Sequence, residues 1–184
     1  MRTRFWCGFF ALAVAACATR PPVPPPSQGA TSTDCLSREP QDAACLYRRA
    51  VALGTEARAH PTRAGELLKE MLDTLARAEA ADPNYDEAGP ARVRALVLLR
   101  APAWPLGPGD AEAGLMAARH AVALRPLYPP NLLALAEASS KTGDGDAARE
   151  NYRRAHEAAL ALPAAADRDE WLREAEQAMQ HVNR

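Results

Sequence analysis

Residues 126–162 read PLYPPNLLALAEASSKTGDGDAARENYRRAHEAALAL, and this stretch decides the fold that the sequence predicts. Its apolar residues recur at helical spacing on both sides of Gly143-Asp144, a pair typical of a tight turn. Small residues recur at positions where two helices would cross, which lets their axes approach to about 8–10 Å. The stretch therefore predicts two antiparallel helices joined by a short turn.

The rest of the chain continues this pattern. Alanine takes 42 of the 184 positions, a composition that favours closely packed helices over strands. Prolines and glycines break the helical periodicity, and the segments between them predict seven helices at about 42–59, 62–81, 87–101, 110–125, 130–142, 145–162 and 167–182. A net charge of −1 excludes a polybasic nucleic-acid binder.

The stretch 126–162 resembles one tetratricopeptide repeat (TPR). The large, large and small residues of the first helix of that motif are here Leu132, Leu135 and Ala136, and the small, aromatic and small residues of the second are Ala148, Tyr152 and Ala155. Leu160 stands where the motif usually ends in proline. The resemblance implies antiparallel helix pairs that stack on one another.

Two further units match this repeat less well. The second has the turn Gly109-Asp110 followed by Gly114, Ala118, Ala121 and Pro126, but it lacks the aromatic residue and carries an insertion at 101–108. The third is degenerate, with Leu75, Ala78 and Pro83 in place and an atypical turn at His60-Pro61. With a capping helix on Glu170 to His181, residues 34–184 predict an all-α, TPR-like α-solenoid of about three repeats.

The N-terminus predicts export. Two arginines precede the apolar run FWCGFFALAVAA at 5–16, which is shorter than the about 20 residues that a membrane span needs. Val14-Ala15-Ala16-Cys17 resembles the lipobox of bacterial lipoproteins, which implies that residues 1–16 are a signal peptide and that Cys17 is lipidated. An ordinary cleaved signal that frees the protein into the periplasm is the alternative. Ala18 after the cysteine resembles the sorting pattern for the periplasmic face of the outer membrane.

A proline-rich segment follows the proposed lipid site. Residues 17–33 contain five prolines and no residue suited to a core, so we expect an extended tether between the membrane and the helical domain. Cys35 and Cys45 are the two cysteines that remain, and an exported chain favours a disulfide between them. Zinc is the competing interpretation, but two thiols without nearby histidines make only half a site.

A longer part of the chain resembles one particular family of repeat proteins. The segment YDEAGPAR at 85–92, a hydrophobic helix, Ala101-Pro102 with a Trp-Pro loop, and Gly109-Asp110 are similar to the T-component lipoproteins associated with TRAP transporters. That resemblance covers about residues 42–182. It implies a periplasmic lipoprotein that cooperates with the solute-binding protein of a transporter, and an oligomer with an internal channel or groove.

No constellation of residues predicts catalysis. Asp144-Gly145-Asp146 lacks the further ligands of a calcium loop, and Asp144 is better explained as the N-cap of a helix. Ser139-Ser140-Lys141 lacks the spacing of a Ser/Lys nucleophile, and the four histidines have no metal-ligand spacing. We therefore expect a protein that is not an enzyme and that needs no metal or cofactor.

Five residues are candidates for partner binding. Trp104, between prolines in the insertion, could fold back over the core as a lid or present a rigid anchor to a partner. The repeat resemblance assigns Leu133, Glu137, Ser140 and Lys141 to the concave face, although a solvated helix face would look the same. The leading hypothesis is a lipid-anchored scaffold that binds a periplasmic protein, and the alternative is a small apolar solute held in a groove or channel of the helix stack.

Overall fold

The computed structural model describes residues 41–182, and this part of the chain is all-α. Its elements are α2 (Ala43–Ala59), the 3₁₀ turn η1 (Pro61–Arg63), α3 (Ala64–Ala81), α4 (Tyr85–Arg100), α5 (Ala111–Leu124), α6 (Pro129–Lys141), α7 (Gly145–Leu160) and α8 (Ala166–Val182). The signal peptide predicted at 1–16, Cys17, the tether at 17–33 and Cys35 lie outside the described residues.

Aspartates begin three of these helices. The carboxylates of Asp42, Asp110 and Asp144 each accept a hydrogen bond from the backbone N–H three residues later, at 2.7, 3.0 and 2.9 Å. These bonds satisfy amides that have no partner inside the helix. The N-cap predicted at Asp144 is confirmed, and Gly143 before it has a φ of +86°, which favours glycine.

The helix boundaries differ from the predicted ones at identifiable residues. The second helix was expected from 62, but Pro61–Arg63 forms a separate 3₁₀ turn and α3 starts at Ala64. The third begins at Tyr85, earlier than expected, because Asp86, Glu87 and Ala88 form a left-handed turn with φ of 49, 54 and 64° ahead of Pro90. The periodicity alone does not distinguish this turn from a loop.

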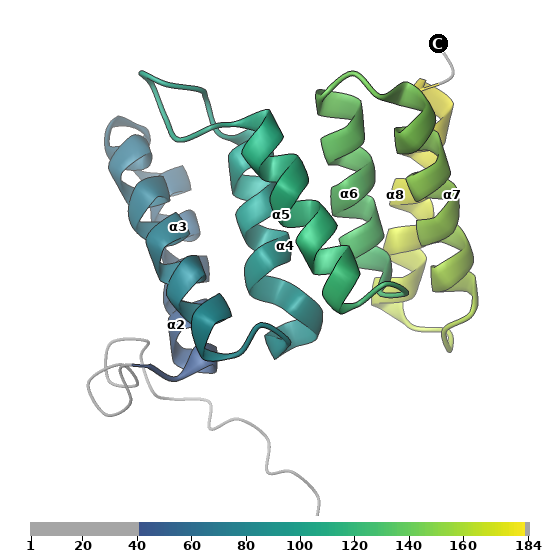
Figure 1. The fold of residues 1–184 in the computed structure, drawn as a ribbon, viewed down its shortest axis with the longest axis horizontal. Coiled ribbons are helices and arrows are strands. Elements are labelled where there is room, and N and C mark those ends of the chain that lie inside the picture. Colours follow the sequence, from purple (N-terminus) through teal and green to yellow (C-terminus); the bar gives the residue numbers. More distant parts are fainter. Residues whose placement is uncertain (1–40, 183–184) are drawn as a thin grey trace, which may run out of the picture.

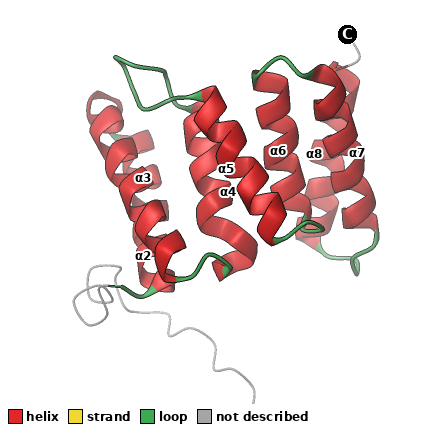
Figure 2. Ribbon diagram, in the orientation of Figure 1, coloured by secondary structure: helices red, strands yellow, loops and turns green. Residues whose placement is uncertain are grey.

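Helices that follow one another in the chain pack side by side (Figures 1 and 2). α2 packs on α3, α4 on α5, and α6 on α7, while α8 packs on α7. In addition α2 contacts α4, α4 contacts α6, and α6 contacts α8, so these four helices form one row. Figure 1 is viewed from the side of α3, α5 and α7, with α2, α4 and α8 behind them.

The core lies between the row of α2, α4, α6 and α8 and the helices α3, α5 and α7 that pack on it. The small residues expected at helix crossings are buried, and so are Leu132 and Tyr152. A Cβ atom added at Gly114 would lie 2.8 Å from two carbon atoms of Leu99, so glycine is what allows α5 to approach α4 this closely. No helix within residues 41–182 combines the length and apolar character needed to cross a membrane.

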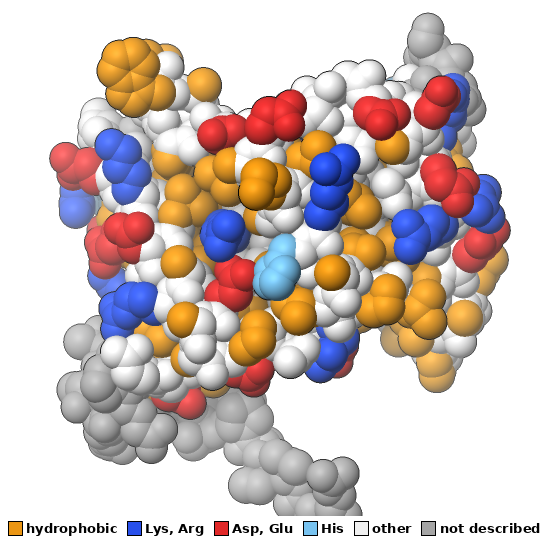
Figure 3. All heavy atoms as spheres, viewed as in Figure 1, with side chains coloured by type: hydrophobic (Ala, Val, Ile, Leu, Met, Phe, Trp, Pro, Cys, Tyr) orange, Lys and Arg blue, Asp and Glu red, His pale blue; other side chains and the backbone are white. Residues whose placement is uncertain are grey.

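The insertion between α4 and α5 is a tightly bonded loop. The N–H of Gly109 donates to the carbonyl of Pro102 at 2.8 Å, and the N–H of Leu106 donates to that of Ala103 at 3.0 Å. The indole of Trp104 is 84% exposed and the side chain of Leu106 is 79% exposed. Hydrophobic side chains project at the corner of Figure 3 where Figure 1 draws this loop. Trp104 therefore does not form a lid over the core.

Candidate functional site

Two cavities meet at α4. The first has a volume of about 420 Å³ and lies between α2, α3 and α4. The second, of about 190 Å³, lies between α4, α6 and α8. Leu96 and Arg100 of α4 line both cavities, so the two adjoin along one face of α4. We call the two cavities together the α4 groove.

The first cavity is mainly apolar. Its walls come from the C-terminal half of α2, the N-terminal half of α3 and the C-terminal half of α4, and they include Ala57, Leu68, Met71, Val93 and Val97. Ala101 and Pro102, at the start of the loop between α4 and α5, also line it. Arg58 is the charged residue that α2 contributes, and it makes none of the ion pairs found within residues 41–182. The cavity suits an apolar group with a polar or anionic end.

The second cavity has an apolar floor and a charged rim. Leu133 of α6 and Trp171 of α8 line it, and the Trp171 ring packs edge-on against Tyr128 at a centroid distance of 5.7 Å. On the rim, Arg100 donates from Nε to Glu137 Oε1 at 3.0 Å and from Nη2 to Glu137 Oε2 at 2.6 Å. This two-point ion pair joins α4 to α6 and fixes the orientation of both side chains.

Glu174 is the second carboxylate at this rim. Burial raises its pKa, Arg100 lowers it, and Glu137 and Glu170 raise it further. The hydrogen bonds to Glu137 raise the pKa of Arg100. Glu174 makes no ion pair with another residue of 41–182, so its charge is less well compensated than that of Glu137.

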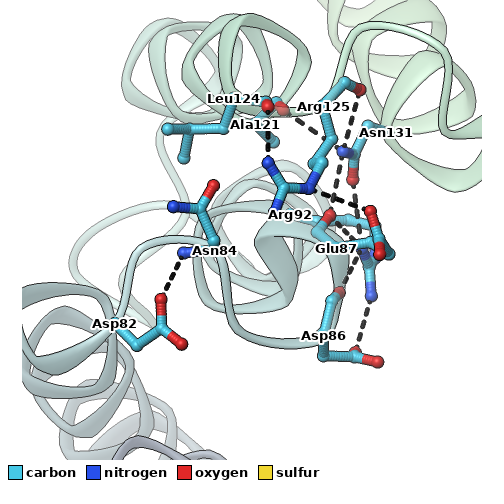
Figure 4. A network of polar contacts seen from close by, with 9 residues as sticks. All are labelled: Asp82, Asn84, Asp86, Glu87, Arg92, Ala121, Leu124, Arg125 and Asn131. Carbon is cyan, nitrogen blue, oxygen red and sulfur yellow. Dashed lines mark hydrogen bonds and ion pairs between the residues drawn. The ribbon is translucent and has the colours of Figure 1, made fainter. Parts of the chain in front are cut away.

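A buried polar network lies beside the second cavity, which Arg92 also lines (Figure 4). Arg92 Nη1 donates to Asn131 Oδ1 at 3.0 Å and to the carbonyl of Glu87 at 3.1 Å, and its Nη2 donates to Asp86 Oδ2 at 2.9 Å. Asn131 Nδ2 donates to the carbonyls of Glu87 at 3.0 Å and Ala121 at 3.2 Å. These bonds hold the left-handed turn of α4 against α5 and α6, and so they fix two walls of the cavity.

The five candidate residues divide into three groups. Leu133 and Glu137 line the second cavity. Ser140 and Lys141 are exposed at the C-terminal end of α6 and line neither cavity, so the structure does not bring them to the groove. Trp104 projects from the loop next to the first cavity.

Sequence reasoning missed the contributions of α4 and α8 to the groove. Leu96 and Arg100 lie four residues apart, as do Glu170 and Glu174, which flank Trp171, so each pair lies on one face of its helix. This spacing was visible in the sequence. Nothing in the sequence shows, however, that these faces meet that of Leu133 and Glu137.

Cys45 is disulfide-bonded, and its Sγ accepts a hydrogen bond from Arg48 Nη2 at 3.6 Å. Because Cys35 lies outside the described residues, the pairing of Cys35 with Cys45 stays a prediction, which thiol titration of the purified protein can check. Residues 41–182 contain no group of three or more His, Cys, Asp or Glu residues that could hold a metal ion.

The chain was compared with protein-family models and with curated proteins. No protein-family model matches the chain, and no curated protein matches it. The function must therefore be argued from the groove and from the sequence.

Proposed function

We propose that this protein is a lipid-anchored periplasmic scaffold, not an enzyme, and that it binds a protein partner in the α4 groove. The observation that carries this proposal is that the two cavities of the groove adjoin at Leu96 and Arg100, which line both of them. An apolar hollow that crosses several helices and has charged residues on its rim suits an extended or helical protein segment. Its walls hold no arrangement of groups typical of a reaction.

The helix pairs α2–α3, α4–α5 and α6–α7 support a TPR-like α-solenoid of about three repeats, with α8 as the cap. In such a stack the first helices of the pairs line one face, which here is the face of the groove. The resemblance to the T-component lipoproteins suggests that the partner is a solute-binding protein of a transporter and that copies of this chain form a homo-oligomer.

The lipobox-like residues 14–17 support attachment at Cys17, most simply at the periplasmic face of the outer membrane. Residues 18–33 would span about 50 Å if extended, which leaves the groove room to meet a partner. We expect Cys17→Ser to move the protein from the membrane to the soluble fraction, or to leave it uncleaved, without changing its helical circular dichroism. Wild-type protein in the soluble fraction would contradict the anchor.

Site-specific photocrosslinking tests the groove. A photoreactive phenylalanine analogue replaces Leu96, which is partly exposed in the groove, and in a matched control it replaces Met116 on α5, which is exposed and lines neither cavity. We expect position 96 to capture a periplasmic protein in intact cells and position 116 to capture none. Equal capture at both positions, or capture of none at position 96, would refute the proposal.

The first cavity favours a second candidate function, the binding of a small apolar solute. Its volume of about 420 Å³ and its mainly apolar walls suit such a ligand. Solvent extraction and mass spectrometry of the purified full-length protein would then find a compound bound at one per chain. The variant Leu68→Phe, which narrows this cavity, should lose the compound, whereas Leu127→Phe, at an exposed loop position, should keep it.

A further inference from the structure

Three carboxylates of α8 are spaced to share one face of the helix, and one of them, Glu174, lines the second cavity. Asp167, Glu170 and Glu174 are three and four residues apart and therefore share one face of the helix. Glu174 lines the cavity next to Trp171, and burial, with smaller contributions from Glu137 and Glu170, raises its pKa. Burial likewise raises the pKa of the Tyr128 hydroxyl, and Asp167 contributes to that rise. Glu174 thus places a carboxylate in the same cavity wall as the Trp171 ring, and Glu170 lies one turn before it on the helix.

These carboxylates make no close ion pair within the described part of the chain. None of the three takes part in an ion pair with another residue of 41–182, whereas Glu137 on the facing helix is held by Arg100. Arg92, the other cation at this cavity, is engaged by Asp86, Asn131 and two backbone carbonyls. Both arginines that line this cavity are thus engaged, and Glu174 is its lining carboxylate without an ion pair among the described residues.

The opposite end of the groove differs in charge. Arg58 lines the first cavity without a carboxylate in ion-pair contact among the described residues. A ligand would suit both ends if it placed positive charge over α8 and apolar groups in the two cavities. It would also have to keep its positive charges away from Arg58. An acidic segment over α8 would instead meet repulsion from like charges in a partly desolvated site.

We propose that the partner segment bound in the α4 groove is amphipathic and basic, with apolar side chains in the two cavities and Lys or Arg side chains paired with Glu170 and Glu174. This inference rests on the protein-binding function proposed above and specifies the chemistry of its partner. The complementary charges would fix the direction of the segment in the groove and speed its association.

Two peptide libraries test this chemistry against the detergent-purified full-length protein. Both consist of dodecapeptides with Leu or Phe at the same positions, and the remaining positions carry Lys and Arg in one library and Asp and Glu in the other. We expect the best basic peptides to bind about tenfold or more tightly than the best acidic ones, and we expect this ratio to fall as salt is added.

A matched pair of variants locates the binding site. Glu170→Gln/Glu174→Gln should weaken the selected basic peptides about fivefold or more, since it removes their carboxylate partners. Glu66→Gln/Glu112→Gln changes the net charge equally, at exposed residues of α3 and α5 that line neither cavity, and should leave affinity within about twofold. Circular dichroism of both variants serves as the folding control, and we expect the wild-type helix content in each.

Three results of the peptide experiments would overturn the inference. These are equal binding of the acidic library, equal loss of affinity in both double variants, and no binding of either library below about 1 mM. The photocrosslinking at Leu96 is independent of peptide charge. A protein captured there whose crosslinked segment is acidic or uncharged would leave the proposed function standing while refuting a basic partner segment.

Discussion

At the scale of single residues, Asn131 illustrates how one side chain can position several helices. It is fully buried, accepts from Arg92, and donates to the carbonyls of Glu87 and Ala121. The sequence places Asn131 in the first turn of a predicted helix, where a polar residue is unremarkable. Its importance depends on the left-handed turn at 86–88, which the periodicity of the sequence does not reveal.

We expect Asn131→Ala to lower the free energy of unfolding by about 2–4 kcal/mol, because it leaves Arg92 and several carbonyls without a buried partner. Urea denaturation followed by circular dichroism measures this change. Ser140→Ala at an exposed position of the same helix serves as the control and should change stability by less than about 0.5 kcal/mol. Equal effects of the two substitutions would show that the network contributes little.

The raised pKa of Glu174 predicts how the stability of the fold depends on pH. Because burial raises its pKa in the folded state above the ordinary value of 4.5, the folded chain binds this proton more tightly than the unfolded chain does. Ionisation of Glu174 therefore lowers stability as pH rises through the folded pKa. Glu174→Gln should be more stable than the wild type at pH 7, and the difference should vanish below pH 4.5. Thermal melts between pH 4 and pH 8 test this, and a difference that grows toward acid would contradict it.

Substitution of Trp104 tests whether its exposed indole contributes to stability or to partner binding. Because its indole is 84% exposed, Trp104→Ala should change the free energy of unfolding by less than about 0.5 kcal/mol. If Trp104 anchors a partner, the same substitution should weaken capture at position 96 in the crosslinking experiment. A large loss of stability would mean that the indole packs against the domain in solution.

At the scale of helices, short-range sequence signals explain most boundaries. Asp42, Asp110 and Asp144 cap their helices with their own side chains, and prolines or glycines occupy most of the breaks between helices. Such signals act within three or four residues, so they can be recognised in the sequence. The α4 boundary is the exception, because its left-handed turn is held by Arg92 and by Asn131 from another helix.

Substitution of two helical glycines by alanine should change the free energy of unfolding in opposite directions. Gly114→Ala would press a methyl group against Leu99 where α5 crosses α4, and we expect a loss of about 1–3 kcal/mol in unfolding free energy. Gly145→Ala, at the start of α7, meets no atom within 4 Å and should be neutral or stabilising by up to about 1 kcal/mol. Chemical denaturation of both variants compares them directly. A loss at Gly145 as large as that at Gly114 would rule out close packing as the cause.

At the scale of the whole molecule, α8 closes the end of the helix stack. Ala175 of α8 is buried in the same cluster as Leu132, Leu133 and Tyr152, with Trp171 packed against it. Without α8 these apolar groups would meet water, and the second cavity would lose the wall formed by Trp171 and Glu174.

We therefore expect deletion of residues 164–184 to lower the free energy of unfolding by at least about 2 kcal/mol and to increase the binding of a hydrophobic dye. Deletion of residues 1–33, which lie outside the predicted helical domain, should leave the unfolding midpoint unchanged. Urea titrations of both truncated chains against the full-length protein test the contrast. Equal midpoints after the C-terminal deletion would refute a capping role for α8.

The sequence by itself determined the all-α class and the positions of the helices, because periodicity, N-caps and turn residues act over a few neighbouring positions. It also identified the small residues that become buried at helix crossings. Only the tertiary structure decided the site, because the α4 groove combines Leu96 and Arg100 with Leu133, Glu137, Trp171 and Glu174 from two other helices. Whether helix faces so far apart in the chain meet depends on crossing geometry and on contacts such as Arg92 to Asn131, which no local pattern specifies.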